Sequence, residues 1–192
     1  MSNIKQLGLS CVMYADDNEG YFPRRNSPDN ITYDDYLAGY DGRDALSSTE
    51  MALSALTEAQ SSRLYECPSS PFNTKPKRSY AISLWGNGSQ AKFRGISGSQ
   101  PVPRSRAIRQ IYDSSGVIAL GERGGNDVGY TMGAVGKDII SAHHMNKDLF
   151  VNLNYNGEEY HQNKSNYLMV DGHVETRSFL SNFSNVEWSS GF

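Results

Sequence analysis

The first twenty residues carry the most restrictive pattern in the chain, an apolar stripe at helical spacing that ends in a firm stop. Apolar side chains recur at three- and four-residue steps, which is the period of one buried helix face. The residues of this stripe are Ile4, Leu7, Cys11, Tyr14 and Ala15. Leu9, Val12 and Met13 widen it, Gly20 is placed for a left-handed C-cap, and Pro23 prevents the helix from resuming. The pattern predicts a helix that buries a broad face against a second layer.

The start of this helix lacks a strong cap. Only Ser2 or Asn3 could serve, and the amphipathic pattern is already in register at Ile4. A helix that begins in this way is typical of the end of a longer one. We therefore expect residues 1–20 to be a truncated N-terminal helix, with Met1 introduced by cloning.

A second helix is predicted at 48–64, where Ser47 and Glu50 have the spacing of a capping box. Beyond Cys67 the chain changes to short apolar runs separated by Gly, Pro, Ser and Asn, which is typical of strands. These runs are 78–85, 116–122, 149–155, 166–170 and 173–179. They predict an antiparallel sheet.

With 192 residues, the chain is long enough for one domain with a real core. We expect a single α+β domain over 1–192, in which residues 1–20 are the helix remnant, 21–77 a helix and loop region, and 78–192 the antiparallel sheet with long loops. The Gly- and Ser-rich stretch 86–106 is expected to be one such surface loop.

Charge, cysteine content and hydropathy limit the kinds of partner and site that this chain can have. The net charge is −3, with 18 basic and 21 acidic residues, so the chain lacks the basic surface that holds a nucleic-acid backbone. The two cysteines, Cys11 and Cys67, are too far apart for a Cys-x-x-Cys unit, and both a single disulfide and two free thiols remain open. No apolar stretch reaches the roughly 18 residues of a membrane span, so the chain as written is expected to be soluble.

The stretch 161–175, HQNKSNYLMVDGHVE, contains a strong hairpin signal. Asp171-Gly172 favours a two-residue type I′ turn, because both central residues of that turn need positive φ. The cross-strand pairs expected from it are Val170 with His173, Met169 with Val174, Leu168 with Glu175, and Tyr167 with Thr176. The residues that would face the core are Tyr167, Met169 and Val174.

His161 precedes Asp171 by ten residues, which is about 33 Å in an extended chain. The two side chains therefore cannot form a local chelate. We expect them to have a structural role, in which His161 and Asp171 fix how the last hairpin docks.

Histidines offer a chemical alternative. His143 and His144 are neighbours whose side chains diverge, so they cannot easily bind one ion together. One of them could combine with His161, Asp171 and His173 to bind zinc or a similar metal, as in a metal-dependent hydrolase. No Gly-x-Ser-x-Gly or other nucleophile signature is present, so enzymatic activity has no positive support in the sequence.

Five segments, in order along the chain, carry a resemblance to a known family. Four of them are NIKQLGLSCVMYADDNEGYFP (3–23), YECPSS (65–70), RSYAIS (78–83) and SSGVIALGER (114–123). The fifth is His161, nine residues, and Asp171-Gly172. Together they resemble the pseudopilin-like proteins with a processing-associated motif of His, nine arbitrary residues and Asp-Gly. The first four look like that family's segment after the membrane helix, its Cys-Pro segment, its Ser-Tyr strand and its apolar strand ending in an acidic residue.

The resemblance implies a type IV pilin-like fold, in which a long N-terminal helix packs on an antiparallel sheet. Such proteins begin with a leader that a prepilin peptidase cuts and N-methylates, followed by a hydrophobic helix that anchors the head outside the inner membrane. This sequence has neither, and we expect both to precede Asn3 in the native gene. Some related pseudopilins bind calcium in a C-terminal loop. The candidate ligands here are Asp171, Glu175, Glu158 and Glu159.

The leading interpretation is a non-enzymatic structural subunit, the periplasmic or surface head of a type II secretion pseudopilin or type IV pilin-like protein. It would act by assembly with other pilin subunits and secretion-system components. The alternative is a membrane-anchored binding module for carbohydrate or protein, with Tyr33, Tyr36, Tyr40 and Trp85 as stacking platforms.

Overall fold

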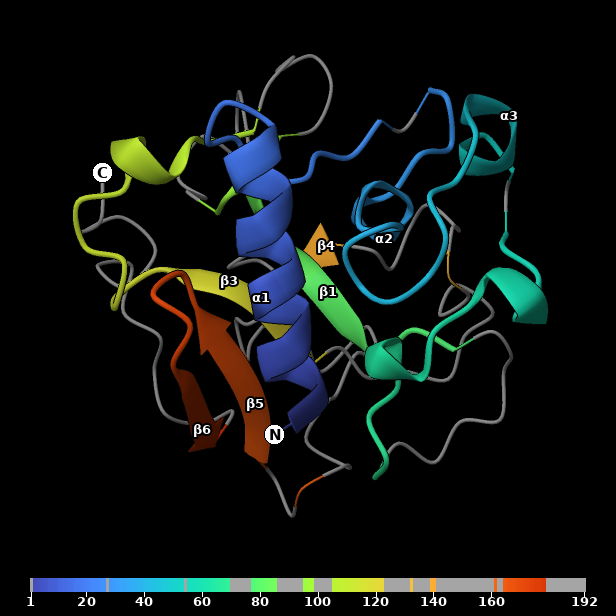
Figure 1. Ribbon diagram of the computed structural model, residues 1–192. Helices are drawn as coiled ribbons and strands as arrows, with labels where there is room; N and C mark the ends of the chain where they lie inside the picture. Colours follow the sequence, from blue (N-terminus) through green and yellow to red (C-terminus); the bar gives the residue numbers. More distant parts are fainter. Residues whose placement is uncertain are drawn as a thin grey trace.

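The computed structural model of the 192-residue chain describes ten segments. They are residues 2–26, 28–53, 55–69, 77–85, 95–98, 105–122, 132, 139–140, 161 and 164–178. All described helices but η4 (Ile108–Gln110) come before the strands along the chain (Figure 1). The helices are α1 (Ser2–Asp17), α2 (Tyr33–Tyr36), α3 (Ser48–Met51), η1 (Glu58–Gln60), η2 (Arg63–Tyr65) and η4 (Ile108–Gln110). The strands are β1 (Tyr80–Trp85), β2 (Ser97–Gly98), β3 (Ile118–Glu122), β4 (Ile139–Ile140), β5 (Lys164–Met169) and β6 (Val174–Ser178). The α+β class is confirmed.

Helix α1 confirms most of the predicted stripe. Its fully buried apolar residues are Ile4, Leu7, Cys11 and Ala15. Gly20 has φ +83°, and its N–H donates to the carbonyl of Ala15, so the left-handed C-cap is present. Leu9 and Met13 do not join the stripe, because they face outward with 62% and 45% of their surface exposed.

The helix predicted at 48–64 is wrong. The capping box of Ser47 and Glu50 forms, but it supports only the single turn of α3. Downstream, Thr57 and Ser62 each start a separate short 3-10 helix, η1 and η2. The Ser62 hydroxyl accepts a hydrogen bond from the N–H of Leu64, and Gln60 Oε1 accepts one from the N–H of Thr57. These local contacts replace a continuous helix, and the N–H of Leu56 donates to the carbonyl of Met132.

The strands of the described segments form one six-stranded sheet in the order β2-β1-β3-β5-β6, with β4 also beside β1. The pairs β1–β3, β3–β5 and β5–β6 are antiparallel, as predicted. The prediction of a wholly antiparallel sheet is wrong, because β1 pairs in parallel with both β2 and β4. Strand β2 lies inside 86–106, so part of that predicted surface loop is buried sheet. The predicted strand at 149–155 lies outside the described residues.

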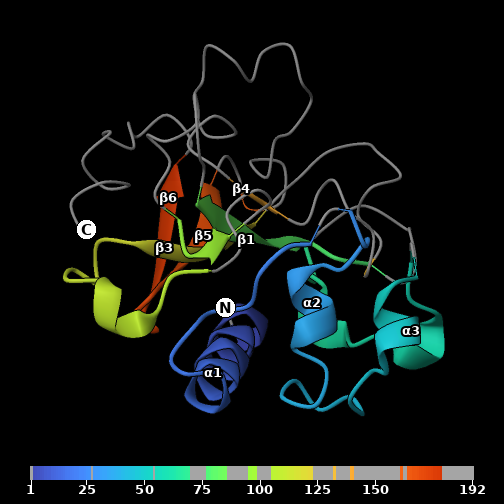
Figure 2. The same ribbon diagram turned by 90° about the horizontal axis from the view of Figure 1, so that it is seen from above.

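Helices α1, α2 and α3 lie on the same side of the sheet (Figure 2). Helix α1 runs across β3 and β5, and its stripe meets side chains from both strands in one hydrophobic core. Strand β3 is buried along its whole length. The central members of this core are Ile4, Leu7, Tyr33, Tyr65, Ile82, Leu120 and Leu168. No described helix is both long enough and apolar enough to cross a bilayer.

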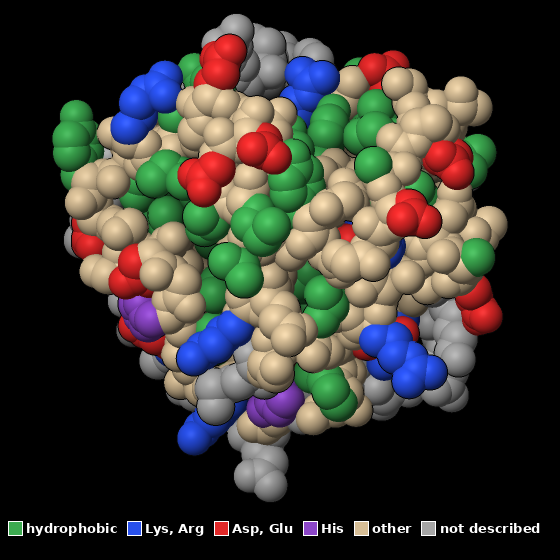
Figure 3. Space-filling view, in the orientation of Figure 1, with side chains coloured by type: hydrophobic (Ala, Val, Ile, Leu, Met, Phe, Trp, Pro, Cys, Tyr) green, Lys and Arg blue, Asp and Glu red, His purple; other side chains and the backbone are tan. Residues whose placement is uncertain are grey.

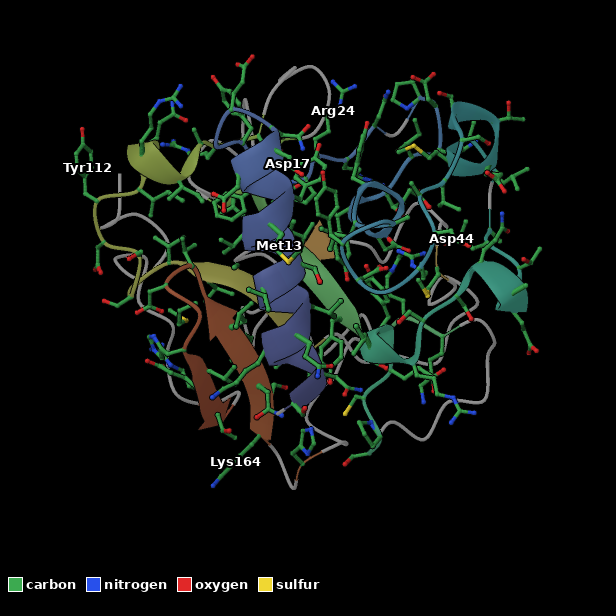
Figure 4. All side chains as sticks on the ribbon, in the orientation of Figure 1. Met13, Asp17, Arg24, Asp44, Tyr112 and Lys164 are labelled. Carbon is green, nitrogen blue, oxygen red and sulfur yellow. The ribbon has the colours of Figure 1, made fainter. Side chains whose placement is uncertain are left out.

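The middle of the outer side of α1 is apolar at the surface, between exposed Lys5 and Gln6 at one end and Asp16 and Asp17 at the other. Hydrophobic side chains gather over this helix in the space-filling view (Figure 3), and Met13 projects from its outer side (Figure 4). A groove of about 270 Å³ runs beside it, between Leu9 and Val12 on the helix and Leu168 and Val170 of β5 and its hairpin loop. We call Leu9, Val12 and Met13 the outer face of α1.

The last hairpin forms, but the predicted two-residue turn is wrong. The N–H of Met169 donates to the carbonyl of His173, so the loop has three residues, Val170, Asp171 and Gly172. Of the Asp-Gly pair, only Gly172 has positive φ, at +90°. This is the type I turn with a following left-handed residue that three-residue loops prefer.

The longer loop shifts the register by one residue. Val174 pairs with Leu168 instead of Met169, and Glu175 pairs with Tyr167. Since side chains alternate along a strand, this shift reverses the predicted faces of β5, whereas Val174 faces the core as predicted. Leu168 and Val174 therefore share the face that packs toward the core beneath α1.

A matched pair of substitutions tests the placement of α1. Leu7 is fully buried, so Leu7→Ala is expected to lower the free energy of unfolding by about 2–5 kcal/mol. Leu9→Ala is the same substitution two residues away, on the exposed side of the helix. It is expected to change the free energy of unfolding by no more than about 0.5 kcal/mol. Urea unfolding monitored by circular dichroism measures both. Equal losses in the two variants would contradict this orientation of the helix.

Candidate functional site

One polar cluster brings together residues that are far apart in the sequence: Cys67, Tyr80, Glu122 and His161. Tyr80 and Glu122 are direct partners in the β1–β3 register. Cys67 follows η2, and His161 precedes β5. Sheet pairing places the ends of β1, β3 and β5 at a common edge, and the cluster forms there.

Glu122 lies at the centre of the cluster and is almost completely buried. Its Oε1 is 2.9 Å from His161 Nε2, and it also accepts a hydrogen bond of 3.1 Å from Asn166 Nδ2. Its Oε2 accepts one of 2.7 Å from the backbone N–H of Asn166. Each carboxylate oxygen therefore has a partner, which offsets the cost of removing the charge from water.

The thiol of Cys67 completes the cluster. Its Sγ is 3.5 Å from His161 Nε2, and the thiol also has side-chain hydrogen bonds with Glu122 and Tyr80. Burial, followed by the negative charge of Glu122, raises the pKa of the Cys67 thiol to about 11. Burial is also the main cause that raises the pKa of the Tyr80 hydroxyl. Both groups are thus held in their neutral forms at neutral pH.

The arrangement is unlike that of a thiol protease. In a Cys-His-acid relay the two ring nitrogens of the histidine face different partners, one the nucleophile and the other the acid. Here the same nitrogen, Nε2 of His161, faces both Cys67 and Glu122. The raised pKa of Cys67 also opposes the thiolate that such chemistry needs.

The donor set does suit a metal ion. Thiol sulfur, carboxylate oxygen and imidazole nitrogen of Cys67, Glu122 and His161 lie within 4.8 Å of one another, and this is the one such group within the described segments. Sulfur with nitrogen and oxygen is a ligand combination of zinc and related ions.

His161 and Asp171 occupy opposite ends of β5, so the structure does not bring the two together. Asp171 instead lies in the hairpin loop, where its N–H donates to the carbonyl of Ser114. This contact ties the loop to the segment before β3. Because the backbone makes this contact, it does not depend on the Asp171 side chain, and His161 lies beyond the other end of the strand. The expected role of the two side chains in hairpin docking stays a prediction.

Asp171 and Glu175 form a different cluster around His173. Nδ1 of His173 is 2.6 Å from Asp171 Oδ1, and Nε2 is 3.0 Å from Glu175 Oε1. Because the two carboxylates contact opposite ring nitrogens, these three side chains do not converge on one ion. The predicted hydrolase set of His161, Asp171 and His173 is therefore not assembled, and Asp171 with Glu175 is not a calcium site of converging oxygens.

Other predicted site residues have separate outcomes. Cys11 and Cys67 are free thiols, so the disulfide alternative is not the one seen. Cys11 is buried in the core, and burial raises its pKa to about 12. The candidate ligands Glu158 and Glu159, and the neighbours His143 and His144, lie outside the described residues.

A second buried polar group is structural. Arg78 Nη1 contacts Asp34 Oδ1 at 2.6 Å with both side chains fully buried. Next to this ion pair, burial and then the charge of Asp34 raise the pKa of Asp35 to about 7. Asp35 accepts hydrogen bonds from the N–H and hydroxyl of Thr32, which caps α2. The group joins α2 to Arg78, which lies just before β1.

Sequence reasoning singled out His161 and Cys67 but missed Glu122 and Tyr80 as site residues. The signal was present in the four segments 65–70, 78–83, 114–123 and 161–172, which each contribute one member. Nothing in their spacing along the chain shows that they meet, because sheet register brings them together.

Comparison with protein-family models, with curated proteins and with solved structures finds no match to this chain.

The hairpin cluster makes a pH-dependent prediction. Hydrogen bonds that the His173 ring donates to Glu175 and to Asp171 raise the pKa of His173 above its ordinary 6.5, and burial opposes this shift. The resulting stabilisation is fully present below about pH 6.5 and is lost as the pH rises through the raised folded-state pKa. Asp171→Ala should therefore lower the melting temperature more at about pH 5.5 than at about pH 8.

Thermal unfolding at both pH values measures this difference, and His173→Gln serves as the control. In a His173→Gln background the Asp171→Ala effect should become the same at both pH values. An unchanged melting temperature in Asp171→Ala, or an equal loss at both pH values in the parent, would contradict the described contacts.

Proposed function

We propose that this chain is the extracytoplasmic head of a pseudopilin-like or type IV pilin-like subunit, with a non-enzymatic role in assembly. The proposal starts from the five segments that resemble that family in order, from residue 3 to the last hairpin. In such a subunit the head would be carried outside the inner membrane by a helix continuous with α1. Its partners would be other pilin-like subunits and components of a secretion or pilus system.

The observation that most supports this proposal is the two-sided helix α1. Its inner stripe is fully buried on β3 and β5, which is how a pilin head would hold its N-terminal helix. Its outer face remains apolar, with Leu9 and Met13 exposed and a groove alongside. An exposed apolar patch on a folded domain marks an interaction surface. On a pilin-like subunit that surface would pack against a neighbouring subunit.

The polar cluster adds support of a second kind. Cys67, Tyr80, Glu122 and His161 come from four of the five segments that carry the resemblance, and all four meet at one edge of the sheet. The segments thus share a structural role in this head. That role is easier to reconcile with one common architecture than with four unrelated likenesses.

The binding-module alternative receives less support from the tyrosines. Tyr33 is fully buried, and its hydroxyl donates to the carbonyl of Tyr80. Tyr36 and Tyr40 both pack edge-on against Tyr14. These rings are engaged in packing and do not form an open stacking platform.

Site-directed photocrosslinking tests the proposed assembly surface. A benzophenone amino acid is placed at position 9 or 13 of the native gene product, expressed in its own host. We expect crosslinks to a second pilin-like subunit from both positions, identified by mass spectrometry. Position 112 is the control, because Tyr112 is 87% exposed and projects from another side of the molecule than Met13 (Figure 4).

Crosslinking from position 9 or 13 but not from 112 would support a specific interface on the outer face of α1. Absence of any crosslinked pilin-like partner at positions 9 and 13, or the same products from position 112, would contradict the proposal. Because Leu9 is exposed, a substitution there is expected to change the free energy of unfolding little, so the labelled protein should remain folded.

A further inference from the structure

We propose that Cys67, Glu122 and His161 bind a single divalent ion of the zinc class. The site joins the segment after η2, the end of β3 and the residue that leads toward β5. This inference does not depend on the pilin-like function, because it rests only on the described side chains.

Two of the three distances between donor atoms are close to those of a metal site of this kind. Zinc bonds of about 2.0–2.3 Å in tetrahedral geometry place the ligand atoms roughly 3.3–3.6 Å apart. The separation of Cys67 Sγ and His161 Nε2 is 3.5 Å, which already lies in that range. His161 Nε2 and Glu122 Oε1, at 2.9 Å, need to move apart by only a few tenths of an ångström.

The direction of the histidine favours a metal site. One ring N–H has a single good hydrogen-bond direction, yet Nε2 of His161 faces both a thiol and a carboxylate oxygen. A metal ion placed between the three atoms would satisfy all of them at once. The His173 cluster gives the contrast, since its two carboxylates lie at opposite ring nitrogens.

Neighbouring groups hold two of the ligands in place. Asn166 donates to both oxygens of Glu122 from its backbone and side chain, and Tyr80 is hydrogen-bonded to Cys67. Such outer partners orient the ligands of metal sites and are an expected part of them. Cys67 and Glu122 are nearly fully buried, whereas the His161 side chain is 27% exposed and gives the ion a route from solvent.

The ligand types select the metal. Calcium and magnesium prefer all-oxygen sites, so a thiol and an imidazole disfavour them. Zinc and cobalt accept sulfur, nitrogen and oxygen together. Binding would replace the thiol proton of Cys67, which passes to solvent, and the three protein ligands leave one tetrahedral position for water.

Cobalt(II) titration of the full chain tests the site, because a cobalt–thiolate bond gives a charge-transfer absorption that oxygen and nitrogen ligands do not. The protein is first stripped with a chelator under reducing conditions. We expect saturation at about one cobalt per chain and displacement by zinc. The absorption should disappear in Cys67→Ser and persist in Cys11→Ser, which changes the other buried thiol.

Two histidine variants complete the test. His161→Ala should weaken cobalt affinity at least about tenfold, whereas His173→Ala should leave it unchanged. We expect His161→Ala to fold, because His161 is the most exposed ligand and Asn166 still bonds both oxygens of Glu122. Circular dichroism checks the fold, and this variant decides the matter if Cys67→Ser does not fold. The proposal is overturned by absence of the thiolate band, by its loss in Cys11→Ser, or by unchanged affinity in His161→Ala.

Discussion

The arrangement of this sheet depends on the hydrogen bonds that the buried carboxylate of Glu122 makes. A charge in that position is tolerated only if its oxygens are bonded, and Asn166 and His161 supply those bonds from the neighbouring strand and its approach. The register between β1, β3 and β5 is thereby linked to one polar contact at their shared edge. Helix α1 covers the apolar face of β3 and β5 with its inner stripe.

The elements that depend on local pattern were predictable from the sequence. The spacing of Ile4, Leu7 and Cys11 located α1, and Gly20 located its end, since helix periodicity and C-cap chemistry act within a few residues. The elements that depend on distant partners were not. The segment 48–64 breaks into short turns, and β1 pairs in parallel with β2 and β4, because contacts made across the fold outweigh local propensity there.

The hairpin and the site show the same division. Asp171-Gly172 marked the turn correctly, but one extra loop residue shifted every pair, and dipeptide chemistry does not count loop residues. His161 and Cys67 drew notice as residue types, whereas Glu122 had no local mark beyond ending an apolar strand. Its importance comes from burial next to Cys67 and His161, which only the sheet register produces. The resemblance to pseudopilin-like proteins names the segments that meet there, and assembly through the outer face of α1 remains the function we propose.

The central claim is that Glu122 and His161 act together at the sheet edge, and a double-mutant cycle tests it most directly. Free energies of unfolding are measured in the presence of a chelator for the parent, Glu122→Gln, His161→Ala and the double variant. Residues in contact are expected to show a coupling energy of about 0.5–3 kcal/mol. Additive losses, within about 0.3–0.5 kcal/mol, would mean that the two residues do not interact and would contradict this account.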